Sequence, residues 1–159
     1  MRCVGIRGAI TVDSNTRAQV LSRTKEVLLK LVEANDIKEE DIACAFLTTT
    51  RDVNAEFPAV AARELGWTDT ALLCGHEMEV PGSLQKCIRV LLLVNTEKTS
   101  EDVTHAYLRG ASVLRNDIRV STPGVGRAGA VLTNRRIEGG NRRSTNGGTG
   151  SRPSKRIQG

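Results

Sequence analysis

The chain has 159 residues, of which 39% are hydrophobic, and it carries a formal net charge of +5 at pH 7. This length suits one domain of ordinary size that buries its own core. No apolar run approaches the roughly 18–20 residues that a membrane-spanning helix needs, so we expect no membrane partner.

The positive charge is concentrated near the C-terminus. Residues 121–159 contain eight Lys or Arg residues and one acid, which gives this segment +7 and leaves residues 1–120 at about −2. Nine of the 15 glycines also lie there, and the segment lacks the apolar periodicity that could offset its ordering entropy. We therefore predict a folded domain over residues 1–120 and a basic, Gly/Arg-rich disordered tail over residues 121–159.

Apolar periodicity predicts strands and helices in alternation. Residues 2–12 read as a strand with glycines at positions 5 and 8, which allow a close backbone approach or a bulge. Apolar residues at helical spacing then follow the possible N-caps at 13–15 and continue to Asn35. The later predicted elements are a strand at 42–50, a helix at 54–65 that Gly66 stops, strands at 70–74 and 86–95, a helix that begins at Thr99 or Ser100 and carries His105 and Tyr107, and a strand at 111–115. This order predicts an α/β (α+β) domain with a mixed sheet and helices on one face.

Four cysteines, at positions 3, 44, 74 and 87, form no C-x-x-C pair. Three of them lie among apolar residues, where a free thiol behaves as a small hydrophobic group. Met1 leads directly into the first predicted strand, without the pattern of a signal peptide. We therefore expect a reducing, cytoplasmic location.

One charge is difficult to explain as a surface residue. Arg89 lies inside the apolar run from Cys87 to Val94, where a charge is costly to bury unless it is paired or used. A bound anion would explain it. The other candidates for chemistry are Glu77, Arg7, Arg63, Cys74 and Tyr107. This set contains no convincing pair of nucleophile and base.

Three further patterns do not indicate a site. Cys74 and His76, with Cys87 or His105, match no zinc spacing, so we expect no metal. Residues 124–129 spell G-x-G-x-x-G, but a proline precedes them and a Gly/Arg-rich coil follows, so we expect no dinucleotide. The tail arginines lack the interleaved aromatic residues of a single-strand binder, so we expect no specific nucleic-acid partner.

Several short motifs occur together in a recognisable order. They are Gly5-Ile-Arg-Gly-Ala9, Phe57-Pro-Ala59 followed by Arg63-Glu-Leu65, Cys74-x-x-Glu77-Met, Lys86-Cys-Ile-Arg89-Val, and Tyr107-Leu before Val113-Leu-Arg115. Each motif is weak alone, but the ordered set is specific. From about residue 2 to residue 120 the sequence resembles the monofunctional, trimeric, non-helical class of chorismate mutase.

The resemblance implies a pseudo-α/β-barrel homotrimer with active sites at the subunit interfaces. It implies the reaction as well, the Claisen rearrangement of chorismate to prephenate in phenylalanine and tyrosine biosynthesis. No cofactor and no metal takes part in that reaction.

The resemblance also assigns roles to individual residues. Arg89 matches the arginine that contacts the breaking ether oxygen. Glu77 and the Cys74 region match groups at the ring and its hydroxyl, and Arg7 and Tyr107 match binders of the side-chain carboxylate. These five are the expected catalytic residues. The expected substrate contacts are Arg7, Leu73, Cys74, Gly75, His76, Glu77, Arg89 and Tyr107 of one subunit and Phe57, Ala59 and Arg63 of its neighbour, with Leu114 and Arg115 at the pocket rim.

Two positions depart from the family pattern. Val60 stands where the family often has a lysine, which removes a charge near the pocket mouth. Leu73 stands where a threonine is common, which removes a hydroxyl. Both changes bear on substrate affinity more than on the chemistry.

A pericyclic reaction suits this residue set. It needs a folded substrate conformer and stabilised charge separation, but no proton transfer. Three alternatives stay open. The first is a small trimeric deaminase or hydrolase that uses an interface arginine and Cys74, and the second is a small-molecule-binding or regulatory trimer that has lost catalytic activity. The third is a nucleic-acid-associated protein that acts through its tail.

Overall fold

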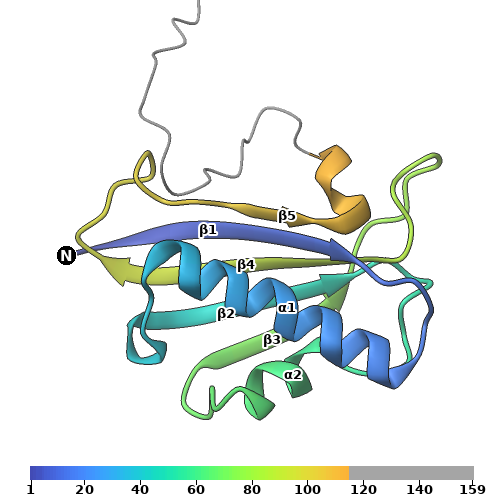
Figure 1. Ribbon diagram of the computed structural model, residues 1–159, viewed down its shortest axis with the longest axis horizontal. Coiled ribbons are helices and arrows are strands. Elements are labelled where there is room, and N and C mark those ends of the chain that lie inside the picture. The colour runs from blue at the N-terminus through green and yellow to red at the C-terminus, as the bar shows by residue number, and fades with distance from the viewer. Residues whose placement is uncertain (115–159) are drawn as a thin grey trace, which may run out of the picture. The chain divides into compact units, whose positions relative to one another are not determined.

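The computed structural model describes residues 1–114, and Figure 1 shows them as a sheet with helices packed against it. In chain order the elements are β1 (Arg2–Thr11), α1 (Arg17–Asn35), the 3₁₀ helix η1 (Glu39–Asp41), β2 (Ile42–Thr49), α2 (Pro58–Glu64), β3 (Ala71–His76), β4 (Cys87–Thr96), β5 (Ala106–Leu108) and the 3₁₀ helix η2 (Arg109–Leu114). The predicted tail at 121–159 and the predicted rim residue Arg115 lie outside the described residues.

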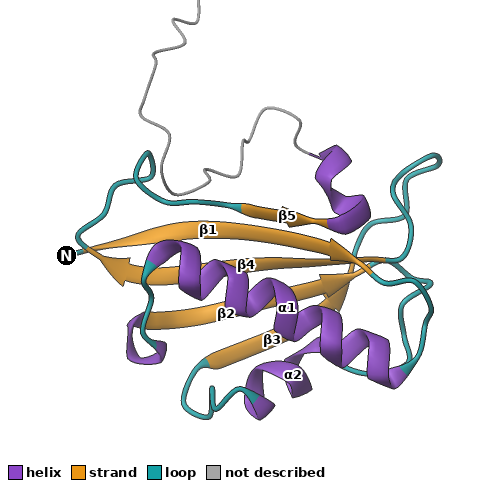
Figure 2. Ribbon diagram, viewed as in Figure 1, coloured by secondary structure: helices purple, strands orange, loops and turns teal. Residues whose placement is uncertain are grey.

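The sheet is mixed, as the sequence predicts (Figure 2). Its five strands follow the order β3-β2-β4-β1-β5. β4 pairs antiparallel with both β1 and β2, whereas β3 pairs parallel with β2 and β5 pairs parallel with β1. The connection between the parallel strands β2 and β3 contains α2, as parallel pairing requires a long crossover.

The two faces of the sheet differ in what covers them. On β1 and β4, the alternate residues Ile6, Ile10, Ile88 and Leu92 are fully buried and belong to one core cluster with α1 and α2. Their side chains therefore face these helices, which Figure 1 shows lying across the same side of the sheet. The intervening residues, Arg89 among them, point to the opposite face, which we call the open face.

α1 approaches β1 closely at Gly8. A Cβ atom at this position would lie 2.8 Å from Leu31 Cδ1 and 2.9 Å from Val27 Cγ2. The register of β1 with β4 continues without a shift through Gly8. Glycine therefore serves a close approach of helix to backbone here, and not a bulge.

Both α-helices begin later than the sequence predicts. Thr16 is the N-cap of α1, and Asn15 has a different task, because its Oδ1 accepts the N–H groups of Asn54 and Ala55, each at 3.0 Å. These two bonds hold residues 54 and 55 in a loop. α2 begins at Pro58, where the missing N–H of proline costs no helical hydrogen bond.

The helix predicted after Thr99 is wrong. Only one turn forms, in which the Asp102 N–H donates to the Thr99 carbonyl at 3.1 Å and the Thr99 hydroxyl donates to Asp102 Oδ2 at 2.6 Å. The turn ends because the Asn35 side chain exchanges two hydrogen bonds with the backbone of Thr104, at 2.8 and 2.7 Å. The chain is thereby held extended, and Tyr107 lies on β5.

The strand predicted at 111–115 is also wrong, because residues 109–114 form η2. Arg109 has a left-handed backbone with φ of 53° and forms an ion pair with Glu26 at 3.1 Å, which turns the chain out of β5. Ala111 is then buried in a small cluster beside β1 and β4. η2 therefore packs on the open face of the sheet.

Candidate active site

One row of residues crosses the whole sheet on the open face. In strand order the row is Tyr107 (β5), Ala9 (β1), Arg89 (β4), Thr48 (β2) and Gly75 (β3), each the register partner of the next. Side chains of directly paired residues lie on the same face. At Gly75, an added Cβ would meet no atom within 4 Å, so the row has open space at its β3 end.

Arg89 is paired with a carboxylate that directly follows β3. Its Nη1 lies 3.1 Å from Glu77 Oε2, and the two side chains are 31% and 27% exposed. The Glu77 N–H donates to the Thr49 carbonyl at 2.8 Å, which holds the Glu77 backbone to β2. The charge that the sequence singles out therefore has a partner, and its guanidinium keeps further N–H donors for a ligand.

Thr48 also contacts Glu77, and the sequence reasoning missed it. Its hydroxyl donates to Glu77 Oε1, so each carboxylate oxygen has one donor, Thr48 on one and Arg89 on the other. Strand alternation was a signal for this residue, because it places position 48 on the face opposite to the buried Leu47. The cross-strand register that brings Thr48 beside Arg89 is not visible in the sequence.

Arg7 lies on the open face of β1, as the next residue on that face before Ala9 of the row. Its register partner is Leu91, and its backbone N–H donates to His105 Nδ1 at 3.1 Å. The half-buried Arg7 guanidinium has no carboxylate partner within residues 1–114. An arginine in this situation is well suited to bind an anionic ligand.

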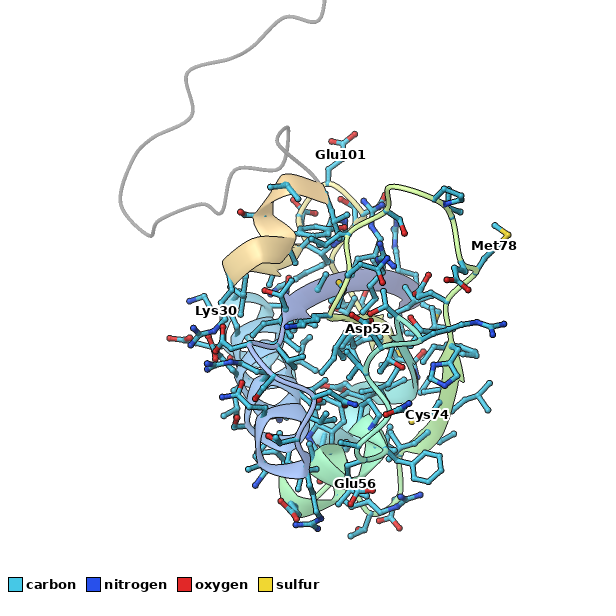
Figure 3. All side chains as sticks on the ribbon, turned by 90° about the vertical axis from the view of Figure 1, so that its right-hand side faces the viewer. Lys30, Asp52, Glu56, Cys74, Met78 and Glu101 are labelled. Carbon is cyan, nitrogen blue, oxygen red and sulfur yellow. The ribbon has the colours of Figure 1, made fainter. Side chains whose placement is uncertain are left out.

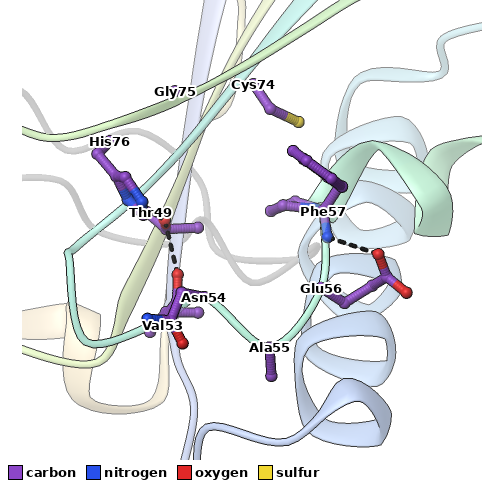
Figure 4. A pocket seen from close by; sticks show the side chains of 10 residues that line it. Thr49, Val53, Asn54, Ala55, Glu56, Phe57, Cys74, Gly75 and His76 are labelled. Carbon is purple, nitrogen blue, oxygen red and sulfur yellow. Dashed lines mark hydrogen bonds between the residues drawn. The ribbon is translucent and has the colours of Figure 1, made fainter.

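A cavity of about 420 Å³ opens at the ends of β2 and β3 (Figure 4). Its walls come from Thr49, the loop 53–57, Pro58 and the β3 residues Cys74, Gly75 and His76. Figure 4 shows the Cys74 side chain on the side of the cavity where Phe57 lies. Phe57 is 68% exposed, so this wall is aromatic and incompletely covered.

The Cys74 thiol is not set up as a nucleophile. Burial raises the pKa of this thiol above its ordinary value, and a backbone contact from Ala59 and the positive charge of Arg63 oppose the shift only in part. The thiol therefore stays neutral at neutral pH, and the reactive form of cysteine is the thiolate. This observation disfavours a hydrolase or deaminase that works through Cys74.

The predicted site residues fall into two groups. The first group is on the open face near the row, and consists of Arg89, Glu77, Arg7, Tyr107 and, through its packing beside Ala9 and Cys87, Leu114. The second group is at β3 and at or beside α2, and consists of Leu73, Cys74, Gly75, His76, Phe57, Ala59 and Arg63. Leu73 and Gly75 of this group lie on the open face, and Gly75 is the β3 end of the row. Cys74, which the sequence reasoning grouped with Glu77, packs against the helix-covered core with the second group.

No three His, Cys, Asp or Glu side chains within residues 1–114 are grouped so that they could hold a metal ion. Neither α-helix in the same range has the length and apolar character to cross a membrane.

Comparison with known proteins agrees with the geometry. Residues 3–118 match the family described as chorismate mutase type I. Chorismate mutase AroH of Bacillus subtilis (strain 168) is 43% identical over 118 residues, which is 74% of this chain and 93% of that protein. Chorismate mutase AroH of Thermus thermophilus is 47% identical over 115 residues, which is 72% of this chain and 94% of that protein.

A solved structure shows the same similarity in three dimensions. The chorismate mutase from Clostridium thermocellum superposes with a TM-score of 0.69 at 49% sequence identity, over 69% of this chain and 98% of that one. The resemblance read from the short motifs is thus confirmed by both the sequence and the fold, and the chain belongs to the type I chorismate mutase family.

Proposed function

We propose that the chain converts chorismate to prephenate by a Claisen rearrangement that needs no cofactor, and that Arg89 is the residue on which the rate depends most. The observation that carries this proposal is the position of Arg89. It is a half-buried guanidinium on the open face, held by Glu77 at 3.1 Å and with further donors available. The chorismate mutases among its relatives give the reaction.

Charge separation explains the choice of an arginine. As the ether bond lengthens, negative charge grows on its oxygen. A fixed guanidinium beside that oxygen binds the transition state more strongly than the ground state, which is the requirement for catalysis. Arginine stays charged at every working pH, so the site needs no proton transfer.

Conformational restriction supplies the second part of the proposed rate acceleration. Chorismate is a flexible dianion, and holding it in a chair-like conformer reduces the entropic barrier. We assign the side-chain carboxylate to Arg7, which has no carboxylate partner among the described residues, and to Tyr107. Glu77 then accepts a hydrogen bond from the ring hydroxyl, because each of its oxygens retains acceptor capacity.

We further propose that a homotrimer completes the site. Two separate groups of expected site residues in one chain support this proposal. Phe57 and Cys74 line the cavity at the ends of β2 and β3, with the charge of Arg63 acting on Cys74, whereas Arg89 is on the open face. The open face also presents a stripe of register partners, Phe46, Leu91 and Leu73, which are 38%, 36% and 60% exposed. Figure 3 shows Met78, which is 84% exposed, projecting from the loop after β3. Adjacent exposed apolar side chains of this kind favour burial against another subunit.

A cytoplasmic location is part of the same proposal. All four cysteines, Cys3, Cys44, Cys74 and Cys87, are free thiols in the structure. Free thiols persist in reducing compartments, and chorismate is a metabolite of central biosynthesis.

The test of the reaction is direct. The purified full-length chain should consume chorismate in a saturable manner, followed by loss of chorismate absorbance and by the appearance of prephenate. A rate that does not exceed the uncatalysed reaction would refute the proposed function.

The test of the shared site uses subunit mixing. Arg89→Ala damages the open-face group and Phe57→Asp damages the wall. In a trimer that contains both variants, one of the three sites combines two intact halves. An equal, random mixture of the two inactive variants should therefore regain activity in roughly a quarter of all sites. Mixing Arg89→Ala with Glu77→Ala is the control. Both of these changes damage the same half, so no activity should return.

A further inference from the structure

We propose that Thr48 is a positioning residue for this reaction: its hydroxyl fixes the Glu77 carboxylate, and through it the Arg89 guanidinium, in the orientation that the substrate needs. The inference rests on the proposed mutase function and extends it to a side chain outside the family motifs described above.

The contacts of Glu77 hold its carboxylate in place. Its backbone is held by the Thr49 carbonyl at 2.8 Å. Its side chain receives one donor on each oxygen, the Thr48 hydroxyl on Oε1 and Arg89 Nη1 on Oε2. With the backbone and both oxygens held, the carboxylate has one orientation. Among residues 1–114, Thr48 is the one neutral side chain that donates to it.

The place of Thr48 in the sheet makes its hydroxyl hard to replace. Its neighbours across the strands are Arg89 on β4 and Gly75 on β3. Gly75 has no side chain, so no other group in this row can reach Glu77 from the β3 side. Threonine is also stiff at χ1, and a donor whose direction is fixed beforehand costs little ordering entropy.

Loss of the hydroxyl would act on Arg89. Without Thr48 as a donor, Glu77 Oε1 is free to turn toward the guanidinium and form a second, parallel hydrogen bond with it. Such a bidentate pair occupies N–H donors that the ether oxygen requires in the transition state. Thr48→Val should therefore lower kcat more than it raises KM. The expected loss in kcat is about 10- to 100-fold, the range for one hydrogen bond to a charged group.

Three variants test the hydroxyl itself. Thr48→Val keeps the shape and removes the donor, Thr48→Ala removes the donor without the β-branch, and Thr48→Ser keeps the donor and should retain most of the wild-type kcat. Thr70→Val is the matched control. Thr70 precedes β3 at the far end of the strand, and its hydroxyl has no partner within residues 1–114. The kcat of the Thr70→Val variant should equal that of the wild type.

A double-mutant cycle with Glu77→Ala separates positioning from simple structural support. Once Glu77 is absent, removing the Thr48 hydroxyl should change kcat less than about twofold. A loss of kcat that persists unchanged in the Glu77→Ala background would overturn the proposal. So would full activity of both Thr48→Val and Thr48→Ala in an active wild-type background. Absence of chorismate turnover in the wild type is a different outcome, since it removes the proposed function first and this inference with it.

Discussion

On β4, Ile88 and Val90 face the helices and are buried, whereas Arg89 and Leu91 face the open side. The same alternation divides β1, where Ile6 belongs to the core and its successor Arg7 does not. One face of the sheet thus packs into the main core of the domain, and the other carries the proposed catalytic residues Arg89 and Arg7 and the exposed apolar stripe. Neighbouring positions in the sequence should therefore respond to substitution in different ways, and pairs of variants can test this division.

The largest effect should come from Arg89 on the open face. Arg89→Ala should lower turnover by about 10²–10³-fold, or about 3–4 kcal/mol, by analogy with the loss of one donor to a developing oxyanion. Its melting temperature should change little, because the side chain does not belong to the core. Steady-state kinetics and thermal unfolding of the same preparation check both parts, and wild-type turnover would contradict the assigned role.

Its immediate neighbour Ile88 should show the reverse pattern. Ile88 is fully buried in the helix-covered core, so Ile88→Ala should reduce the free energy of unfolding by about 3 kcal/mol through lost burial and a cavity. The fraction that remains folded at low temperature should turn over chorismate at a rate near that of the wild type. Denaturant titration measures the first quantity. A folded Ile88→Ala protein as inactive as Arg89→Ala would show that the two faces do not divide stability from chemistry.

A smaller effect is expected at the wall of the cavity. Phe57 is largely exposed and is not one of the buried core residues, so Phe57→Ala should change the free energy of unfolding little. It should raise KM by roughly 5- to 30-fold while kcat changes less, because the side chain contributes uniform binding. An equal loss in kcat and in kcat/KM would instead place Phe57 among the groups that act only in the transition state.

The smallest effect concerns pH. Turnover should vary little between about pH 6 and pH 9, because no group in the mechanism changes its protonation state. Burial raises the pKa of the Cys74 thiol and raises that of Cys87 to about 11, so both shifts favour the neutral thiol. A bell-shaped profile centred near pH 7 would point to His76 or His105 as an acid or base.

The sequence predicts which face of an element is buried wherever its apolar residues recur at a regular spacing. β1, α1, β2 and β4 all have the regular apolar spacing that identifies them, and Arg89 is conspicuous because a charge inside an apolar strand needs a partner. Glu77 is that partner. The sequence places Glu77 near Arg89, but only the structure shows that the two side chains form an ion pair.

The segment after β4 is predicted badly because distant residues determine it. The acids after Thr99 favour a helix locally, but the Asn35 side chain binds the Thr104 backbone and β5 then pairs with β1. Thr48 is missed for a similar reason. Its role depends on the register of β2 with β4, and no local pattern reports that register.

The most direct measurement compares how Arg89→Ala changes the binding of a bicyclic ether dicarboxylate, which mimics the transition state, with how it changes the binding of chorismate itself. If Arg89 acts on the developing oxyanion, the variant should bind the mimic on the order of 10²–10³-fold more weakly and chorismate only slightly more weakly. Equal weakening of both ligands would mean that Arg89 only holds the substrate, and would contradict the account.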